Sequence, residues 1–229
     1  MYLMKNTLVI TILMFGSWHC FSQGFVNLNF ENAIITPDPS SPYYPNAVYA
    51  SDAIPGWTAT GFIGPNDILY NSASLGSTSV SILGTSGFPP ALDGNFSIYL
   101  YGGSTASSAS ISQTAVVPVS AASLLFEAQQ SGTGTLQVSL GGQNISFFAL
   151  SSGANYTLYG GNIPSAFDNQ SEQLMFSALE GGNNFWNIDD IQFSPSAVPE
   201  PSVLGLSALG GLLLAWRRWK KRDFESKNE

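Results

Sequence analysis

The chain has very few basic residues, and those few are confined to its two ends. Its 229 residues include seven lysines and arginines against 15 aspartates and glutamates. One basic residue is Lys5 and the other six follow residue 216, so residues 24–197 carry 11 carboxylates, no basic side chain and a formal charge of −11. Lysine and arginine supply most of the affinity for nucleic acid and for phosphorylated ligands. The middle of the chain therefore excludes nucleic acid as a partner, and it disfavours anionic ligands.

Histidine and cysteine are equally scarce. The only histidine is His19 and the only cysteine is Cys20. Both lie in a segment that we expect to be removed, so the mature chain has no imidazole, thiolate or ammonium group. This excludes Ser-His-Asp hydrolysis, cysteine catalysis, Schiff-base chemistry and histidine-rich zinc sites. It also excludes disulfides, although a domain of about 170 residues is large enough to be stable on its hydrophobic core.

The N-terminus has the pattern of a secretory signal peptide. Lys5 supplies the positive charge, residues 7–16 are mostly apolar, and Cys20 and Ser22 are the small residues expected before a cut. We predict a signal peptide over residues 1–22, with cleavage after Ser22. A lipoprotein would instead be acylated at Cys20, but the bulky Trp18 and His19 stand where small residues are needed.

The C-terminus has the pattern of a membrane stop. Residues 203–216 are mostly apolar, and at roughly 1.5 Å per residue they span about 21 Å of a hydrocarbon core near 30 Å. Five cations follow within six residues: Arg217, Arg218, Lys220, Lys221 and Arg222. Because cations stay on the cytoplasmic side, we predict a transmembrane helix over 203–216, a basic cytoplasmic tail over 217–229 and an exported domain before them.

The tripeptide Pro199-Glu200-Pro201 stands directly before this helix, in a linker that we place at 195–202. Tripeptide, short apolar segment and basic cluster together resemble the PEP-CTERM sorting signal of Gram-negative bacteria. The resemblance implies export, recognition of the tripeptide by an exosortase, removal of the helix, and a location in the cell envelope or extracellular matrix. The alternative is an ordinary single-pass anchor that follows a proline-rich linker.

Alternating apolar and polar residues predict that the remainder is all-β. Leu136, Val138 and Leu140 alternate with polar residues, Gly141-Gly142 fits a tight turn, and alternation resumes after it. Similar runs recur along the chain, separated by clusters of Gly, Ser and Asn, and no long helical period lies between them. We predict one two-sheet β-sandwich over residues 24–194.

Several short segments resemble, in order, the galactose-binding-like jelly-roll domains. They are Asn29-Phe30-Glu31, Pro55-Gly56-Trp57, Leu92-Asp93-Gly94-Asn95, Ile111-Ser112-Gln113-Thr114 and Trp186-Asn187-Ile188-Asp189-Asp190-Ile191. The resemblance implies a jelly roll and makes glycan binding the leading function. It also implies a structural calcium ion held by Glu31 with Asp189 or Asp190, since oxygen ligands suit calcium. The alternative is that these carboxylates lie in water at strand ends or cap turns.

Sugar binding requires a flat aromatic ring with amides or carboxylates beside it. Five tyrosines are candidates for such a platform: Tyr43, Tyr44 and Tyr49 in a proline-rich stretch, and Tyr99 and Tyr101 in a predicted strand. Tyrosines on strands are also ordinary packing residues. Trp57 and Trp186 we expect in the core.

We expect the domain to be non-catalytic. Because the domain is acidic, we also expect any glycan ligand to be neutral. A glycoside hydrolase remains a rival, since two carboxylates suffice for that chemistry. The carboxylates considered are Asp93, Glu127, Asp168, Glu172 and Glu180, and none lies in a catalytic motif. The other rival is a structural or adhesive matrix protein with no small ligand.

Overall fold

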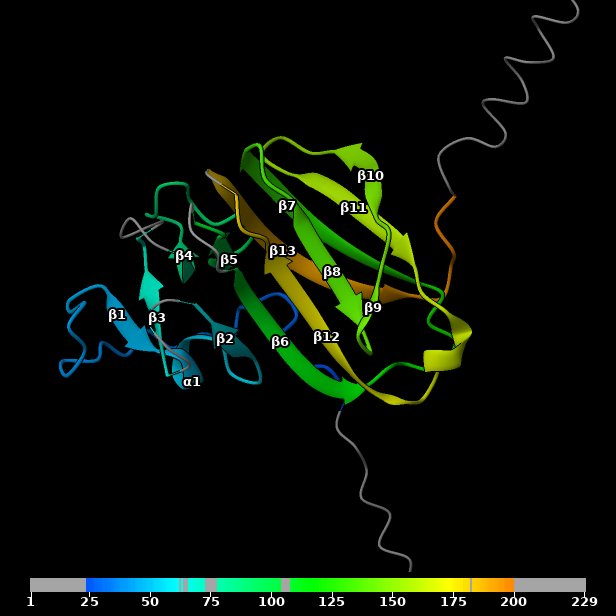
Figure 1. Cartoon of the computed structure of the whole chain (residues 1–229), viewed down its shortest axis with the longest axis horizontal. Coiled ribbons are helices and arrows are strands. Elements are labelled where there is room, and N and C mark those ends of the chain that lie inside the picture. Colours follow the sequence, from blue (N-terminus) through cyan, green and yellow to red (C-terminus); the bar gives the residue numbers. More distant parts are fainter. Residues whose placement is uncertain are drawn as a thin grey trace, which may run out of the picture.

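The computed structural model describes residues 24–61, 63, 66–72, 78–103, 108–181 and 183–199. These residues form two sheets packed face to face, which confirms the predicted all-β jelly-roll sandwich (Figure 1). The larger sheet has eight strands in the order β1-β3-β4-β5-β13-β7-β11-β10, and the smaller has five in the order β2-β6-β12-β8-β9. All neighbours are antiparallel except β3 and β4, which are parallel.

The elements have the following bounds. They are β1 (Ala47–Tyr49), α1 (Ala50–Ala53), β2 (Thr58–Thr60), β3 (Asp67–Tyr70), β4 (Ser79–Gly84), β5 (Phe96–Tyr101), β6 (Ala109–Val116), β7 (Ser123–Gly132), β8 (Leu136–Leu140), β9 (Gln143–Asn144), β10 (Phe148–Ser152), β11 (Thr157–Asn162), the 3-10 turn η1 (Ser165–Phe167), β12 (Ser171–Ala178) and β13 (Asn184–Ser194).

Period-two alternation determines which side chains fill the space between the sheets. In the smaller sheet Ile111, Val138 and Phe176 are fully or almost fully buried, and the residues beside them in each strand are polar, except Met175. Trp57 and Trp186 also belong to the core, at 6% and 4% exposure, as expected. Burial of apolar surface at about 25 cal/mol per Å² is the main force that holds the two layers together.

The predicted turn at Gly141-Gly142 connects β8 to the two-residue strand β9. Both glycines have positive φ, +57° and +75°, a region that favours glycine. The strand that we predicted after this turn is short, because β9 ends at Asn144 and the next strand begins at Phe148.

The central strand β13 binds both neighbours in the larger sheet and carries a bulge between Asp189 and Gln192. Asp190, inside the bulge, has φ +43°. Also inside the bulge, the Ile191 amide donates to the Leu28 carbonyl at 3.0 Å, which ties the first described segment to the last strand. A bulge redirects side chains locally, and here it lies beside the candidate site.

No helix among residues 24–199 that the structure describes is long and apolar enough to span a membrane. The predicted signal peptide, membrane helix and basic tail, including Arg217, Arg218, Lys220, Lys221 and Arg222, lie outside the described residues. Of the sorting tripeptide the structure describes Pro199, which is exposed. The structure therefore does not test these predictions, and the signal peptide stays a prediction from the sequence.

Candidate functional site

Residues 85–95 form a loop beside the outer face of the larger sheet, and a groove lies between them. The groove has a volume of about 690 Å³. It is lined by Phe88, Pro89, Pro90, Leu92, Tyr99, Gln129, Gln130, Ser131, Asn155 and Phe185. A second hollow of about 340 Å³ shares Gln129, Gln130 and Asn155 with it and extends toward Tyr156. We call the two together the loop groove.

Strand register brings three rings together on the sheet side of the groove. Phe185 on β13 is opposite Tyr101 on β5, and their rings are stacked with centroids 4.4 Å apart. The Tyr99 ring lies 5.7 Å from the same Phe185. Tyr99 and Tyr101 are only 5% and 8% exposed. Of the predicted tyrosines these two therefore form an apolar floor, and Tyr99 alone lines the groove.

Two side-chain amides, of the buried Asn187 and the exposed Asn155, hold the loop in place above this floor. Asn187 is fully buried; it accepts a hydrogen bond from Ser97 Oγ at 2.7 Å and donates one to the Pro90 carbonyl at 3.2 Å. Asn155 donates to the Leu92 carbonyl at 2.8 Å. Since unpaired buried polar groups are costly, these bonds determine where the loop can lie.

Phe88 is the most exposed large apolar side chain among the described residues, with 91% of its surface accessible. Its ring borders a groove whose rim also carries the exposed amides of Gln129, Gln130 and Asn155. A ring beside amides is the combination that binds the apolar face and the hydroxyls of a sugar. Sequence reasoning missed Phe88; the only signal was its place directly before Pro89-Pro90, in a loop.

The outer face of the smaller sheet offers a contrasting surface without rings. Along one row Thr58, Ser112, Met175 and Ser139 are successive cross-strand partners. The other intervening positions of β2, β6, β8 and β12 carry hydroxyls, amides or Val116. Uncharged polar side chains therefore cover this face, seen toward the viewer in Figure 1. It provides hydrogen-bonding groups but no stacking surface, so the loop groove is the better candidate.

The other three predicted tyrosines lie elsewhere in the fold. Tyr44 and Tyr49 are 57% and 36% exposed, whereas Tyr43 is half-buried. Tyr49 ends β1, which β3 and β4 separate from β5, and its hydroxyl donates to Asp38 at 3.1 Å. The five tyrosines thus do not form one platform, and glycan contact by Tyr43, Tyr44 or Tyr49 stays a prediction.

Carboxylates gather beside the groove, at the bulge of β13. Glu127 and Asp189 are register partners on β7 and β13, and the Asp93 amide donates to Asp189 at 3.3 Å. Asp189 is 2% exposed, and desolvation raises its pKa to about 8, while hydrogen bonds from the amides of Asp190 and Asp93 oppose that shift. Desolvation also raises the pKa of Glu127, opposed by a hydrogen bond from Tyr156.

Asp189 should make the domain less stable as the pH rises. Between about pH 4 and pH 8 the folded state keeps a proton that the unfolded state releases, so the free energy of unfolding should fall with a slope of up to about 1.4 kcal/mol per pH unit. Asp189→Asn should flatten this part of the curve and be the more stable form at pH 8. Urea unfolding of both proteins from pH 5 to pH 9 measures it, with exposed Glu180→Gln as the control. Equal pH slopes in all three proteins would contradict the assignment.

The carboxylates that we expected to bind calcium have different hydrogen-bond partners. Both oxygens of Glu31 are engaged by residues 95–96: Oε1 accepts from the backbone amides of Asn95 and Phe96 at 2.7 and 2.9 Å, and Oε2 accepts from the Asn95 side chain at 2.8 Å. Asp190 accepts from Gln192 Nε2 at 2.7 Å. Among the described residues no three His, Cys, Asp or Glu side chains are grouped so as to hold a metal ion. Calcium binding at Glu31, Asp189 and Asp190 stays a prediction.

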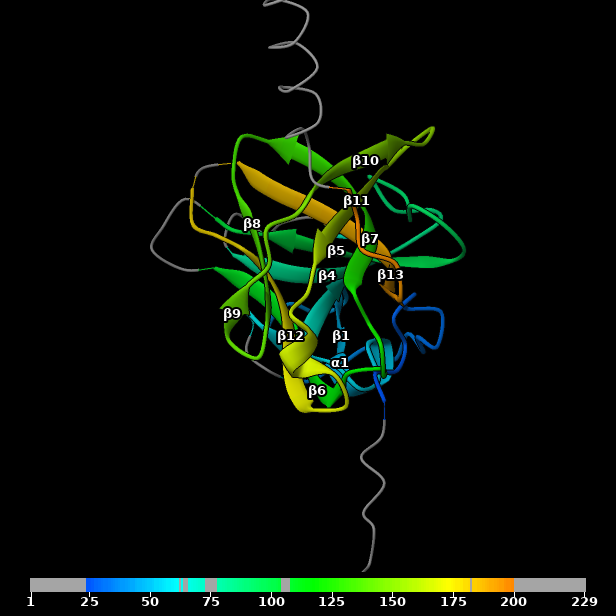
Figure 2. The same cartoon turned by 90° about the vertical axis from the view of Figure 1, so that its right-hand side faces the viewer.

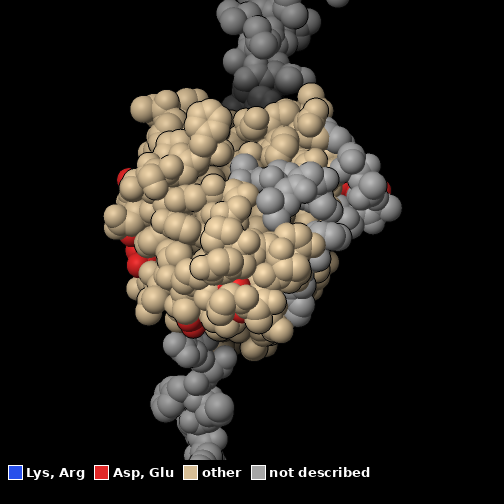
Figure 3. Space-filling model, turned by 90° about the vertical axis from the view of Figure 1, so that its left-hand side faces the viewer, with Lys and Arg blue, Asp and Glu red and all other residues tan. Residues whose placement is uncertain are grey.

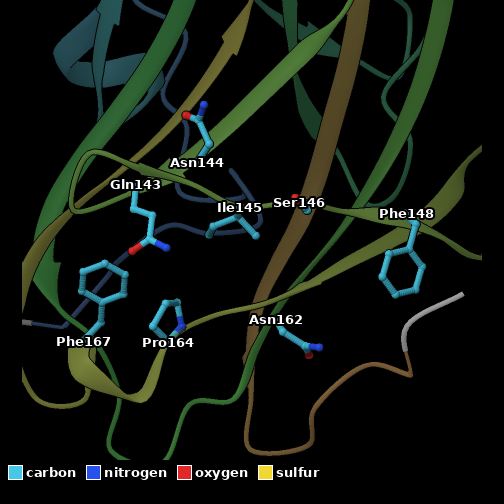
Figure 4. A pocket seen from close by; sticks show the side chains of 8 residues that line it. All are labelled: Gln143, Asn144, Ile145, Ser146, Phe148, Asn162, Pro164 and Phe167. Atoms are coloured by element: carbon cyan, nitrogen blue, oxygen red, sulfur yellow. The ribbon is translucent and has the colours of Figure 1, made fainter. Parts of the chain in front are cut away.

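A separate hollow of about 500 Å³ lies at the opposite end of the larger sheet, near β9, β10 and β11 (Figure 4). Its lining includes Phe148, Pro164 and Phe167 together with the amides of Gln143 and Asn162. In Figure 4 the Asn162 side chain points away from Phe167, toward the segment that follows β13.

The face of the domain at the β1 side carries few carboxylates. Figure 3 shows them there as small separate groups, with no basic side chain visible. The described part of the chain contains no lysine or arginine, so no internal lysine or arginine salt bridge can form there.

Comparison with known proteins assigns the C-terminal segment. Residues 197–221 match the PEP-CTERM protein-sorting motif. This confirms the resemblance drawn from the tripeptide, the apolar run and the basic cluster, and it indicates an exported surface protein. A search of curated proteins found no match.

Solved structures similar to the chain include two carbohydrate-binding modules. The TmCBM61 module, solved with β-1,4-galactotriose, has a TM-score of 0.43 and 13% identity over 74% of this chain and 96% of that one. The family 11 module of Clostridium thermocellum, solved with a mixed-linked tetrasaccharide, has a TM-score of 0.36 and 12% identity over 67% and 97%. The enzymatically active domain of tailspike protein 4 from bacteriophage CBA120 has a TM-score of 0.37 and 14% identity over 62% and 19%. Similarities of this strength do not extend to what this chain binds.

Proposed function

We propose that this is an exported, sorted surface or matrix protein whose jelly-roll domain binds a neutral glycan in the loop groove without catalysis. The sorting motif supports the destination. The observation that carries the binding is the groove itself, where an almost fully exposed Phe88 stands beside three exposed amides over a floor of packed rings.

The chemistry of the groove suits an uncharged sugar. The apolar face of a pyranose would stack on Phe88, and its hydroxyls would meet Gln129, Gln130 and Asn155, all within the same lining. Ring stacking and amide hydrogen bonds need no charge on the ligand.

The surrounding charge disfavours acidic polysaccharides. Glu127 and Asp93 lie beside the groove, and the exported region has a formal charge of −11 without one basic residue. An anionic glycan would be repelled by this field and would find no guanidinium or ammonium partner. Salt would screen that repulsion.

The test is a glycan array probed with the mature protein, followed by titration of the best ligands. We expect binding to neutral glycans, with a dissociation constant that changes less than about twofold between 50 and 500 mM salt. Strong, salt-sensitive binding to acidic glycans would contradict the proposal. Release of reducing ends from a bound glycan would favour the carboxylate-based hydrolase, with Glu127 and Asp93 as the first residues to mutate, and binding to nothing would favour a structural matrix protein.

Two further parts of the proposal concern partners. An exosortase-like enzyme would recognise Pro199-Glu200-Pro201 while the predicted helix holds the chain in the membrane, and removal of the helix would release the domain. Calcium, if bound near Asp189, would act on the bulge and the loop, and no step of glycan binding depends on it.

A further inference from the structure

The segment after β13 folds back onto the larger sheet and does not leave the domain at the end of the strand. The Ala122 amide donates to the Ser194 carbonyl at 2.7 Å, and Ser123 Oγ donates to the Ser196 carbonyl at 2.8 Å. In Figure 2 this segment, drawn in orange, runs beside β7 and β11. The first part of the predicted linker, residues 195–198, is therefore attached to the domain.

Val198 ends this attachment in a specific seat. Its amide donates to Asn162 Oδ1 at 2.8 Å, and its carbonyl accepts from Asn162 Nδ2 at 3.1 Å, so one side chain binds both backbone groups. The Val198 side chain is 7% exposed, although the neighbouring Ala197 and Pro199 are exposed.

The side chain of Val198 lies against Gly160, where an added Cβ atom would push its neighbours aside. A Cβ atom on Gly160 would be 2.9 Å from Val198 Cγ1, 2.8 Å from Leu125 Cδ2 and 2.7 Å from Leu150 Cδ1. All three distances are too short for ordinary contact. Gly160 thus leaves the space that Val198 fills, and we call Leu125, Leu150, Gly160 and Asn162 the valine seat.

The residue bound in the valine seat, Val198, comes directly before the sorting tripeptide. Val198 precedes Pro199, and the residues that match the sorting motif begin at 197. With Val198 seated, only residues 199–202 separate the domain from the predicted helix, and they can span at most about 14 Å. With residues 195–198 released, eight residues can span about 28 Å.

We propose that the valine seat restricts access of the sorting enzyme to the tripeptide, with Asn162 as the positioning residue. An enzyme that cleaves a peptide binds several residues in extended form on either side of the reacting bond, but here the residue before the tripeptide is buried against its own domain. Processing then requires release of Val198, after which the longer tether lets the tripeptide enter the enzyme. This inference rests on the sorting half of the proposed function and is independent of glycan binding.

The experiment follows processing of the full chain in a host that contains the sorting enzyme, by pulse-chase and intact mass. Asn162→Ala should speed loss of the tail about tenfold, because two hydrogen bonds that favour the seated form are removed. Gly160→Ala should have the same effect by a different route, since it fills the seat. The control is Gln143→Ala. Gln143 is an exposed amide that lines the hollow of Figure 4 together with Asn162 but makes no hydrogen bond to residues 195–198.

Hydrogen exchange of the isolated protein separates the seat from the sorting reaction. The Val198 amide should lose about tenfold of its protection in Asn162→Ala and none in Gln143→Ala, while the melting temperatures of all forms stay within a few degrees. Processing that stays unchanged or slows in Asn162→Ala and Gly160→Ala would overturn the inference. A parent chain that keeps its tail would instead overturn the proposed sorting, and the exchange result would still report whether the seat exists.

Discussion

Phe88→Ala is expected to weaken binding of a neutral glycan about tenfold and to leave the stability of the domain unchanged. With 91% of its surface exposed, Phe88 contributes little to the core, so its removal should move the melting temperature by less than about 2 °C. A stacking ring is worth on the order of 1.4 kcal/mol, which corresponds to a factor of ten in the dissociation constant. Calorimetric titration of the ligand found on the array measures the change.

Tyr44→Ala is the matched comparison, because Tyr44 is also an exposed ring, at 57%, in a proline-containing loop of the same domain. If the loop groove is the site and Tyr44 is not, Tyr44→Ala should bind like the parent. Phe88→Tyr should then retain most of the affinity, whereas Phe88→Leu should not. A loss of binding in Tyr44→Ala with Phe88→Ala unaffected would move the site from the loop groove to the loop before β1.

The layers of the fold were predictable because they depend on local periodicity. Ile111, Val138 and Phe176 lie in three strands whose core-facing residues take every second position, and a strand with that pattern buries one apolar face. The Gly141-Gly142 turn carried its own conformational signal in the same way. Both tryptophans were also assigned correctly to the core.

The candidate site was less predictable because its parts come together only through long-range contacts. Asn187 contacts Pro90 across 97 residues, and Glu31 contacts Asn95 across 64. No spacing in the sequence predicts such pairs. The contacts of Glu31 with residues 95–96 were therefore not predicted, and its role as a calcium ligand stays a prediction. The exposed ring of Phe88 was missed for the same reason.

The same holds at the C-terminus, where we predicted a linker over 195–202 and the structure shows that residues 195–198 contact the domain. Residues 195–198 read as a linker because they contain Ser, Pro and Ala, but Asn162 and Gly160, which receive Val198, lie 36 and 38 positions earlier. Whether such a linker is free depends on the surface of the domain against which it lies, and here β11 provides the residues that bind Val198.

Asn187→Ala should be more damaging than Phe88→Ala, because it lowers the stability of the domain and also disturbs the loop groove. Asn187 and Ser97 are both fully buried, and the substitution leaves the Ser97 hydroxyl and the Pro90 carbonyl without their partners. Each unsatisfied group costs about 1–3 kcal/mol, so we expect a loss of about 2–4 kcal/mol in the free energy of unfolding. For a domain of this size that lowers the melting temperature by roughly 5–15 °C.

The loop that carries Phe88 loses one of its anchors in the same variant, so glycan affinity should fall even at temperatures where the domain is folded. Ser97→Ala separates the two effects, because it removes the hydroxyl but leaves Asn187 able to donate to Pro90. We expect Ser97→Ala to lose stability while its glycan affinity stays within about twofold of the parent, and Asn144→Ala, an exposed amide on β9, to change neither by a measurable amount. If Asn187→Ala binds glycan like the parent at 10 °C, where it is folded, the loop does not need this anchor. In that case the groove is formed by the ring floor and the Asn155 contact with Leu92.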